Sequence, residues 1–414
     1  MASIRPFRAL RPAKERAAEV AALPYDVYSR EEARREVEGR PYLFLNIDRP
    51  ETQFPAEQDI YAPCVYQKAD AMLREQEKAG VYVQDDSACY YIYELTMGDR
   101  AQTGLVACSS VDDYLNGVIK KHENTRRDKE EDRIRHVDAC SAQTGPIFLA
   151  YRGRTEVRGL LSEIKERKKP EADFRTEDSI RHRVWKIEEE EKIARLTGLF
   201  GEMEHTYIAD GHHRAASAVA VSRMRREAYP GYTGREEFNY FLSVLFPDDE
   251  LMILDYNRVL KDLNGYSPEE LLEKLSGPFQ VEKAEKAPYR PEKKGEMGFF
   301  LDGSWYRLEV RKERCRMDPV EALDVAYLQR EALEPLWGIK DPKTDRRIDF
   351  VGGIRGLSEL EERCRADCAA AFSMYPTSMA ELFGVADAGL LMPPKSTWFE
   401  PKLRSGLFIH KIER

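Results

Sequence analysis

The spacing of apolar and polar residues along the chain predicts alternating helices and strands. Apolar residues recur at helical spacing over Ile60–Lys78, Lys129–Cys140 and Ala215–Arg225, which favours a helix in each segment. Ser29 is a preferred residue at the start of a helix, and the segment after it predicts a helix that ends near Val37.

Short segments rich in β-branched and aromatic residues predict the strands. They are Tyr42–Ile47, Cys89–Leu95, Thr103–Val111, Gly117–His122, Ile147–Tyr151, Val184–Ile187, Glu204–Ala209, Phe238–Phe246 and Gly406–Ile412. This alternation indicates an α/β (α+β) fold. We expect an N-terminal α/β region over residues 1–100, a central domain over 101–262 and a C-terminal α/β region over 263–414. The last region is expected to contain a helix over Pro268–Leu275 and a hairpin over Gly298–Val310.

Composition and charge exclude some classes of protein. The 414 residues carry a formal net charge of −9, whereas binding to nucleic acid needs a basic surface, so we expect no nucleic-acid partner. We expect no membrane partner, because no apolar run approaches the roughly 18 residues of a membrane span. Met1–Leu10 lacks a signal-peptide pattern and the seven cysteines are scattered, which favours reduced thiols in the cytoplasm.

The segment Tyr207–Arg214, YIADGHHR, carries the strongest candidate chemistry. A predicted strand, a turn at Asp210-Gly211 and a predicted helix place unpaired N–H groups and the positive end of a helix dipole beside each other. That arrangement attracts phosphate. Gly211 allows close approach of the backbone, Arg214 offers a bidentate grip, and His212 and His213 are expected to add donors.

Two other interpretations of this segment stay open. The first is a histidine-rich turn that is held only by internal hydrogen bonds. The second is a zinc site at His212 and His213, which needs further ligands, whereas His205 points away at strand spacing.

A second candidate cluster occupies Lys121–Arg135. The apolar residues before it deliver His122 and Glu123 to the end of a predicted strand, and Thr125 and Arg126 follow in a turn. A carboxylate in such a place, beside arginines, acts as a general base or holds Mg²⁺. Read alone, the same residues are a solvated charge run. We assign His122 and Thr125 to substrate, and we assign Arg126, with Arg133 on the next helix, to the nucleotide.

Two smaller groups are also candidates for contact with substrate. Lys395, Ser396 and Thr397 form a donor cluster after a pair of prolines, and Tyr25 and Asp26 lie in an N-terminal turn. For both groups the alternative is a purely structural role, as a polar surface loop or as a turn stabilised by aspartate.

The central motifs resemble the nucleotide-binding fold of the ParB/sulfiredoxin-like superfamily. In that fold, a strand that ends in a carboxylate precedes a helix, a strand that opens with Gly-Pro-Ile, and a Gly-x-x-Arg turn that holds phosphates. The similar segments here are Val118–Glu123, Lys129–Cys140, Gly145–Leu149 and Gly211–Arg214. The resemblance implies a central ParB/sulfiredoxin-like phosphate- and nucleotide-binding domain.

Within that superfamily, the motif Asp210-Gly211-His212 is similar to that of the free-serine kinases. The resemblance implies that Asp210 and Glu123 support phosphoryl transfer, as catalytic groups or as ligands of Mg²⁺. Sulfiredoxins carry a reactive cysteine directly after the motif glycine, where this chain has His212, so we do not expect repair of peroxiredoxin.

The whole chain also resembles a large bacterial domain-of-unknown-function family, "ten-fifteen". The segments that carry this resemblance are Ile4–Phe7, Pro24–Val27, His122–Thr125, Asp210–Arg214 and Pro394–Thr397. Asn257-Arg258 stands where the family pattern has His-Arg, so we give that position no catalytic role.

The hypothesis from the sequence is a phosphotransferase, a kinase that uses ATP or ADP with Mg²⁺ to phosphorylate a small hydroxyl metabolite, with free L-serine as the first acceptor to test. Phosphoryl transfer depends mainly on positioning and charge stabilisation, for which these residues are suited. The alternatives are a nucleotide-binding switch without metabolite turnover and a zinc-dependent hydrolase.

Overall fold

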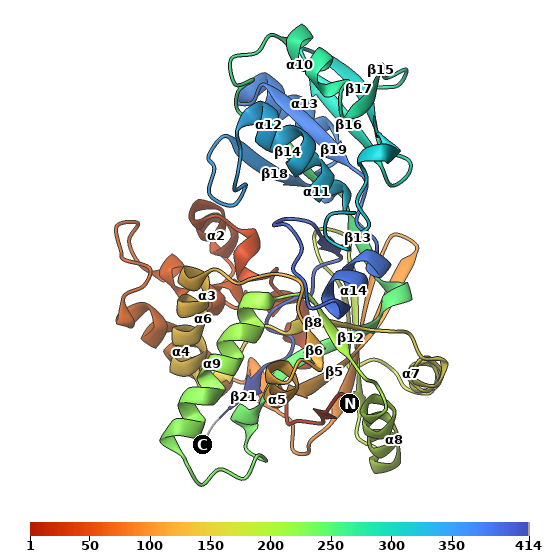
Figure 1. Cartoon of the computed structure of the whole chain (residues 1–414). Helices are drawn as coiled ribbons and strands as arrows, with labels where there is room; N and C mark the ends of the chain where they lie inside the picture. The colour runs from red at the N-terminus through yellow and green to blue at the C-terminus, as the bar shows by residue number, and fades with distance from the viewer. Residues whose placement is uncertain (413–414) are drawn as a thin grey trace. The chain divides into compact units, whose positions relative to one another are not determined.

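The computed structural model describes residues 1–412 and divides the chain into two compact units. The first unit contains Met1–Leu251 and the end of the chain from Pro401, and the second contains Met252–Glu400. Both units combine helices with β-sheet, so the predicted α/β class is confirmed (Figure 1). The expected region over 1–100 and residues 101–251 of the next expected region lie in the first unit, whereas residues 252–262 belong to the second unit.

A mixed sheet forms the centre of the first unit, with the strand order β6-β11-β8-β12-β5-β4-β10-β9, and β1 pairs with β5. Strand β11 runs parallel to β6 and antiparallel to β8. The bounds of these strands are β1 Ile4–Arg5, β4 Tyr90–Met97, β5 Arg100–Ser110, β6 Ile119–Lys120, β8 Ile147–Tyr151, β9 Ala172–Arg175, β10 Arg181–Ile187, β11 Thr206–Asp210 and β12 Tyr240–Pro247.

The helices of the first unit surround this sheet. Helices α4, α6 and α9 pack side by side (Figure 1), and α7 packs against α8. The bounds are α1 Ala17–Val20, α2 Arg30–Val37, α3 Leu45–Asp48, α4 Pro63–Lys78, α5 Val111–Leu115, α6 Arg127–Cys140, α7 Thr155–Arg167, α8 Glu190–Gly201 and α9 His212–Ala228. Two small strand pairs complete the unit, namely β2 Leu10–Pro12 with β3 Tyr82–Gln84 and β7 Ala142–Gln143 with β21 His410–Lys411.

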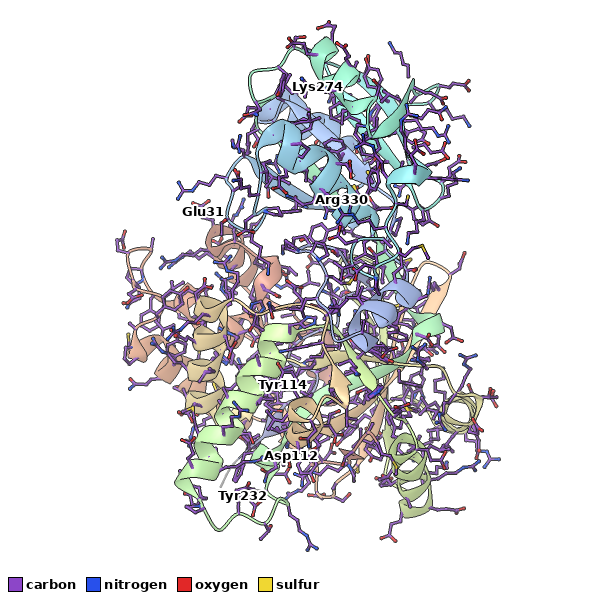
Figure 2. All side chains as sticks on the ribbon, in the orientation of Figure 1. Glu31, Asp112, Tyr114, Tyr232, Lys274 and Arg330 are labelled. Carbon is purple, nitrogen blue, oxygen red and sulfur yellow. The ribbon has the colours of Figure 1, made fainter. Side chains whose placement is uncertain are left out.

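Apolar burial on one face of the sheet fixes the beginning of α9. One core cluster joins Leu105, Leu149 and Ile208 of the sheet to helices α7 and α8, and it includes Ala215 and Ala218 of α9. Small side chains at these two positions let the helix axis come close to the strands. At its other end, the Arg226 guanidinium of α9 lies 2.7 Å from Asp112 and 5.1 Å from the ring centre of Tyr232 (Figure 2).

The segment after Pro401 crosses the first unit and holds its parts together. The backbone of Ser405 pairs with that of Ala22, and Ile409 pairs with Leu10. Side chains add ion pairs from Arg404 to Asp178, from Lys411 to Glu77 and from Lys402 to Asp210. The end of the chain therefore connects the N-terminal helices to the central sheet.

The second unit is built on an antiparallel sheet with the order β15-β17-β16-β19-β14-β18. The bounds are β13 Met252–Leu254, β14 Tyr256–Leu260, β15 Phe279–Lys283, β16 Glu296–Leu301, β17 Ser304–Val310, β18 Ile348–Gly352, β19 Ala370–Met374 and β20 Trp398–Glu400. The helices are α10 Pro268–Leu275, α11 Asp324–Leu328, α12 Glu334–Trp337, α13 Ser358–Ala366 and α14 Met379–Asp387.

Most predicted elements are present. The helix after Ser29 begins with a capping box in which Ser29 and Glu32 satisfy each other's backbone N–H groups. The prediction of a strand over Tyr42–Ile47 is wrong, because this segment forms a turn and helix α3. A fully buried apolar run fits a helix as well as a strand, and here the Asn46 amide closes the turn by donating to the carbonyls of Arg40 and Leu43.

Two predicted strands are shorter in the structure than expected. Of Gly117–His122, only Ile119–Lys120 forms a strand, and of Gly406–Ile412, only His410–Lys411 does. Single backbone contacts hold neighbouring residues: the N–H of Thr206 donates to the Val118 carbonyl, and Ile409 pairs with Leu10. Between residues 1 and 412, no helix is long and apolar enough to cross a membrane.

Two glycine substitutions should change the stability of the first unit in opposite directions. A Cβ added at Gly104 in β5 would lie 2.6 Å from Val244 Cγ1 and 2.7 Å from Phe246 Cζ, so Gly104→Ala should cost about 1–3 kcal/mol through overpacking. A Cβ at Gly159 in α7 meets no atom within 4 Å, so Gly159→Ala should add up to about 1 kcal/mol. Urea unfolding of both variants measures this, and equal shifts would contradict the predicted crowding at Gly104.

Candidate functional site

Asp210 is the last residue of β11 and lies beside an irregularity of the sheet. Ile208 pairs with Leu149 and Asp210 pairs with Phe148, so β11 has one extra residue between these pairs. A bulge of this kind changes the direction of the side chains that follow it, and bulges are common next to active sites. The bulge therefore sets the direction in which the Asp210 carboxylate leaves the sheet.

Gly211 connects the strand to α9 in a conformation that favours glycine. Its φ angle is +92°, and an added Cβ would lie 3.0 Å from the guanidinium atoms of Arg214, which folds back over this residue. The first turn of the 17-residue helix α9 thus begins beside Asp210, with N–H groups that have no partner within the helix. This is the strand-turn-helix arrangement that the sequence predicts.

Two cations flank the Asp210 carboxylate. Lys402 Nζ lies 3.1 Å from Oδ2, Arg214 Nη2 lies 3.9 Å from Oδ2, and the N–H of Gly211 donates to Oδ1 at 2.8 Å. Burial alone would raise the pKa of Asp210, but Lys402, Arg214 and the Gly211 N–H hold it well below the usual range. The carboxylate is therefore ionised at neutral pH and is a weak proton acceptor.

His122 and His212 form a buried pair next to Asp210. Their rings meet edge to face with centres 4.6 Å apart, and among the described residues His122 Nδ1 and His212 Nε2 have no hydrogen-bond partner. Burial lowers the pKa of His122 to about 4, against the opposing effects of Asp210 and the Ile208 backbone, and burial beside His122 lowers that of His212 well below the usual value. Both rings are neutral at pH 7, and each has a free nitrogen.

His213 and Arg126, which the sequence predicts as contacts to a nucleotide, have partners within the chain. The backbone N–H of Arg126 donates to His213 Nε2 at 3.0 Å, so this nitrogen is an acceptor and is already used. The Arg126 side chain is 61% exposed and pairs with Asp128 at 2.8 Å. Because the turn before α6 occupies Nε2 of His213, only the other ring nitrogen of His213 can act as the predicted donor, and nucleotide contact by His213 and Arg126 stays a prediction.

Glu123 and Thr125 lie in the segment between β6 and α6. Because β6 and β11 are parallel, their carboxyl ends meet at the same edge of the sheet, and half-buried Glu123 directly follows His122 there. The Thr125 hydroxyl donates to Glu130 at 2.7 Å and so stabilises the beginning of α6. The edge that carries Asp210 therefore also carries the second predicted carboxylate.

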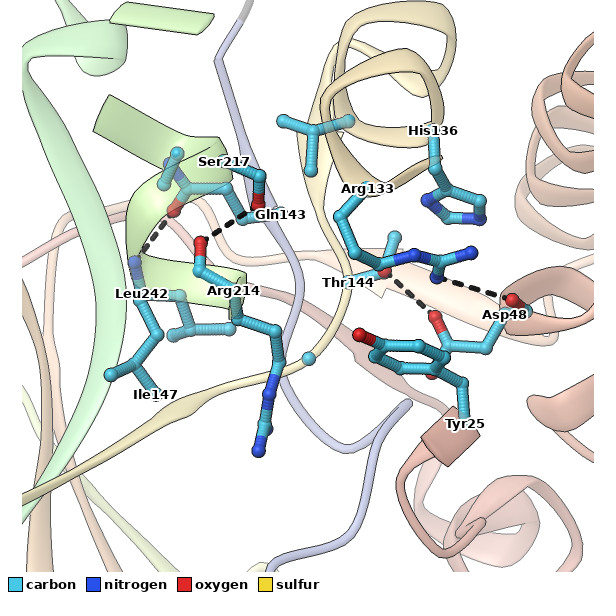
Figure 3. A pocket seen from close by; sticks show the side chains of 13 residues that line it. Tyr25, Asp48, Arg133, His136, Gln143, Thr144, Ile147, Arg214, Ser217 and Leu242 are labelled. Atoms are coloured by element: carbon cyan, nitrogen blue, oxygen red, sulfur yellow. Dashed lines mark hydrogen bonds between the residues drawn. The ribbon is translucent and has the colours of Figure 1, made fainter. Parts of the chain in front are cut away.

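A pocket adjoins this edge on the inner side of Arg214 (Figure 3). Its empty volume is about 400 Å³ with its solvent-open mouth included, and it lies between α6, α9 and the N-terminal residues. Three predicted residues line it, namely Tyr25, Arg133 and Arg214. The Arg133 guanidinium lies 4.1 Å from the ring centre of Tyr25 and 2.8 Å from Asp132. Tyr25 stands next to Asp26, which is exposed and whose charge acts on His213.

The structure adds three residues that sequence reasoning missed. Asp48 and His136 line the pocket, and Lys402 contacts Asp210. The spacing of Arg133 and His136, three apart on a helix, was a usable signal for a shared face. The wrong strand prediction for the residues before Asp48 concealed its place in the pocket. Lys402 is 192 positions from Asp210, and the sequence around it does not indicate their contact.

Lys395, Ser396 and Thr397 belong to the second unit, where internal bonds hold them. The Ser396 hydroxyl donates to the Pro393 carbonyl at 2.6 Å, and the Ser396 carbonyl accepts from Thr377 at 2.9 Å. Lys395 has a φ angle of +58°, and its carbonyl accepts from Arg258 at 3.1 Å. These contacts give Ser396 a structural role within its own unit, and substrate contact by the three residues stays a prediction.

The ligands that a zinc-dependent hydrolase needs are not assembled here. In the part of the chain that the structure describes, no three side chains of His, Cys, Asp or Glu are grouped to hold a metal. Mg²⁺ makes smaller demands, since one or two carboxylates and substrate phosphates suffice, and Asp210 and Glu123 at one sheet edge fit that requirement.

A family model described as "Protein of unknown function (DUF1015)" matches residues 4–326. The chain belongs to the DUF1015 family. The match includes Tyr25, Glu123 and the Asp210–Arg214 turn, whereas Lys402 lies beyond its end. No curated protein matches this DUF1015 chain.

Several solved structures are similar to this DUF1015 chain at low identity. A conserved hypothetical protein from Pyrococcus furiosus is 14% identical with a TM-score of 0.34, and the match covers 74% of this chain and 94% of that one. A free serine kinase in complex with ADP is 14% identical with a TM-score of 0.35, covering 73% and 92%. SbnI from Staphylococcus aureus, with a C-terminal truncation, is 12% identical with a TM-score of 0.37, covering 72% and 85%. Likeness at this level carries no argument about function.

Protonation of His122 should make the first unit less stable in mild acid. The folded pKa of about 4 lies below the usual 6.5, so the unfolded chain binds this proton first as the pH falls from 6.5 to 4, and stability is lost in that window. Replacing the ring by His122→Gln should remove about 2 kcal/mol of the loss between pH 7 and pH 4.5. Urea unfolding of both proteins at the two pH values tests this, and parallel losses would show that His122 is not buried as a neutral ring.

Proposed function

We propose that this protein is a nucleotide-dependent phosphotransferase that transfers a phosphoryl group to a small hydroxyl metabolite, with free L-serine as the first acceptor to test. The observation that carries the proposal is the surroundings of Asp210. An ionised carboxylate stands between Lys402 and Arg214, at the N-terminus of a long helix entered through Gly211. These groups suit a phosphate chain with its divalent cation.

Each group has a distinct part in the proposed reaction. The N–H groups of the first turn of α9 and the Arg214 guanidinium bind phosphate oxygens, and Lys402 offsets negative charge that develops during transfer. Asp210 would hold Mg²⁺, which supplies charge neutralisation when bound, and this leaves the Glu123 carboxylate for proton transfer. The ParB/sulfiredoxin-like resemblance of the sequence implies the same use of these residues.

Proton transfer is better assigned to Glu123 than to Asp210. The cations around Asp210 depress its pKa and make it a poor base, whereas Glu123 is a second, half-buried carboxylate at the same edge of the sheet. His122, with a neutral ring and a free Nδ1, is available to orient the acceptor hydroxyl. We therefore propose Glu123 as the base and Asp210 as the group that keeps cations in place.

The test is turnover by the purified protein with Mg²⁺, with ATP and ADP offered separately, with and without L-serine. We expect consumption of nucleotide that depends on the acceptor, and Glu123→Gln should lower kcat at least about 100-fold while nucleotide Kd changes less than about threefold. Full turnover by Glu123→Gln would remove it as the base. Nucleotide binding without turnover of any hydroxyl acceptor would favour the switch.

Arg214→Met should weaken nucleotide binding about 10- to 100-fold, because it removes a charge-assisted grip on phosphate. The matched control is Arg223→Met, which removes an exposed arginine from the same helix and should leave Kd unchanged. Calorimetric titration with ADP measures both. Equal affinities of the two variants would mean that the first turn of α9 does not hold the phosphates.

A further inference from the structure

The pocket beside Arg214 contains a carboxylate that the proposed reaction does not yet use. Asp48 is 2% exposed and lines the pocket. Its Oδ1 accepts from the Thr144 hydroxyl at 2.9 Å, and within residues 1–412 its carboxylate has no other hydrogen bond and no ion pair. A buried ionised carboxylate is costly unless a cation compensates it.

The nearest cation is committed elsewhere. Arg133 gives Nε and Nη2 to Asp132, at 3.0 and 2.8 Å, and its Nη1 reaches only the backbone carbonyl of Asp48, at 3.2 Å. Arg133 therefore forms its side-chain ion pair with Asp132, and no contact joins the Arg133 guanidinium to the Asp48 carboxylate, which acts on it only through space.

His136 adds a second acceptor on the same wall. Its Nε2 lies 2.8 Å from the carbonyl oxygen of Ile47, so this nitrogen carries the proton. Burial, and then the charge of Arg133, lower the pKa of His136, so the ring is neutral. Its Nδ1 is then a bare acceptor, and it is buried without a partner among the described residues.

The other residues that line the pocket limit how a ligand can lie in it. Figure 3 shows Arg133, Thr144, Asp48 and Tyr25 on one side of the pocket, with the Tyr25 hydroxyl turned toward the interior, and Arg214, Ser217 and Leu242 on the other side. A ligand that reaches from Asp48 toward Arg214 would place its far end beside the group that is proposed to hold phosphate.

We propose that this pocket binds the acceptor through an ammonium group, so that the acceptor is a small amino alcohol or hydroxy amino acid. An ammonium has three donors and one positive charge, which match the Asp48 carboxylate and the free Nδ1 of His136. The acceptor hydroxyl then lies toward Arg214. The role of this ligand as acceptor rests on the proposed phosphotransfer. Binding of the ligand to the pocket does not depend on turnover.

The test is equilibrium binding without nucleotide, measured by calorimetry on the full chain with L-serine, ethanolamine and D-glycerate. L-serine and ethanolamine, which carry the ammonium, should bind, and D-glycerate, which lacks it, should bind at least about 100-fold more weakly. Asp48→Asn keeps the acceptor for Thr144 but removes the charge, so it should weaken L-serine at least about 100-fold. Asp70→Asn, at an exposed ion pair with Arg74 on α4, is the control and should bind as the wild type does.

Tyr25→Phe provides a second variant that keeps the ring over Arg133 and removes only the hydroxyl. It should weaken L-serine about 5- to 10-fold. Binding of D-glycerate as tight as that of L-serine, unchanged binding by Asp48→Asn and Tyr25→Phe, or no binding of either amine would each overturn the proposal. Because no nucleotide is present, these results are separate from any failure of phosphotransfer.

Discussion

The ion pair between Asp210 and Lys402 is the contact on which the candidate site depends. Asp210 ends the strand that leads into α9, and Lys402 comes from the segment that returns after the whole second unit. Without Lys402, the carboxylate would lose its closest cation in a poorly solvated place, where an unpaired charge is unfavourable. The pair therefore links the end of the chain to the geometry of the strand-turn-helix motif.

Arg214 divides the site into two compartments. On one side lie Asp210, Gly211 and the first turn of α9, and on the other lies the pocket with Asp48 and His136. Its guanidinium also donates to the Pro146 carbonyl, so the side chain is held in place. A fixed cation between two compartments is suited to a transfer reaction, because positioning the reactants accounts for much of the rate in phosphoryl transfer.

Neighbouring residues were sufficient to predict those elements whose stabilising contacts lie within a few positions of one another. The capping box at Ser29, the helix over Pro268–Leu275 and the strand over Ile147–Tyr151 follow from nearest neighbours alone. The same holds for the turn at Gly211, where glycine marks a positive φ between a strand and a helix. The buried run before Asp48 failed because burial on all sides removes the periodicity that separates helix from strand.

The sequence by itself determined the α/β class, the strand-turn-helix at Asp210–Arg214 and the cluster at His122 and Glu123, because each depends on residues within a few positions of one another. Only the tertiary structure decided that Lys402 pairs with Asp210, that His213 is already engaged and that Asp48 and His136 share a pocket with Arg214. Such contacts join segments far apart in the chain. They depend on sheet order and helix packing, which have no signature in the spacing of neighbouring residues.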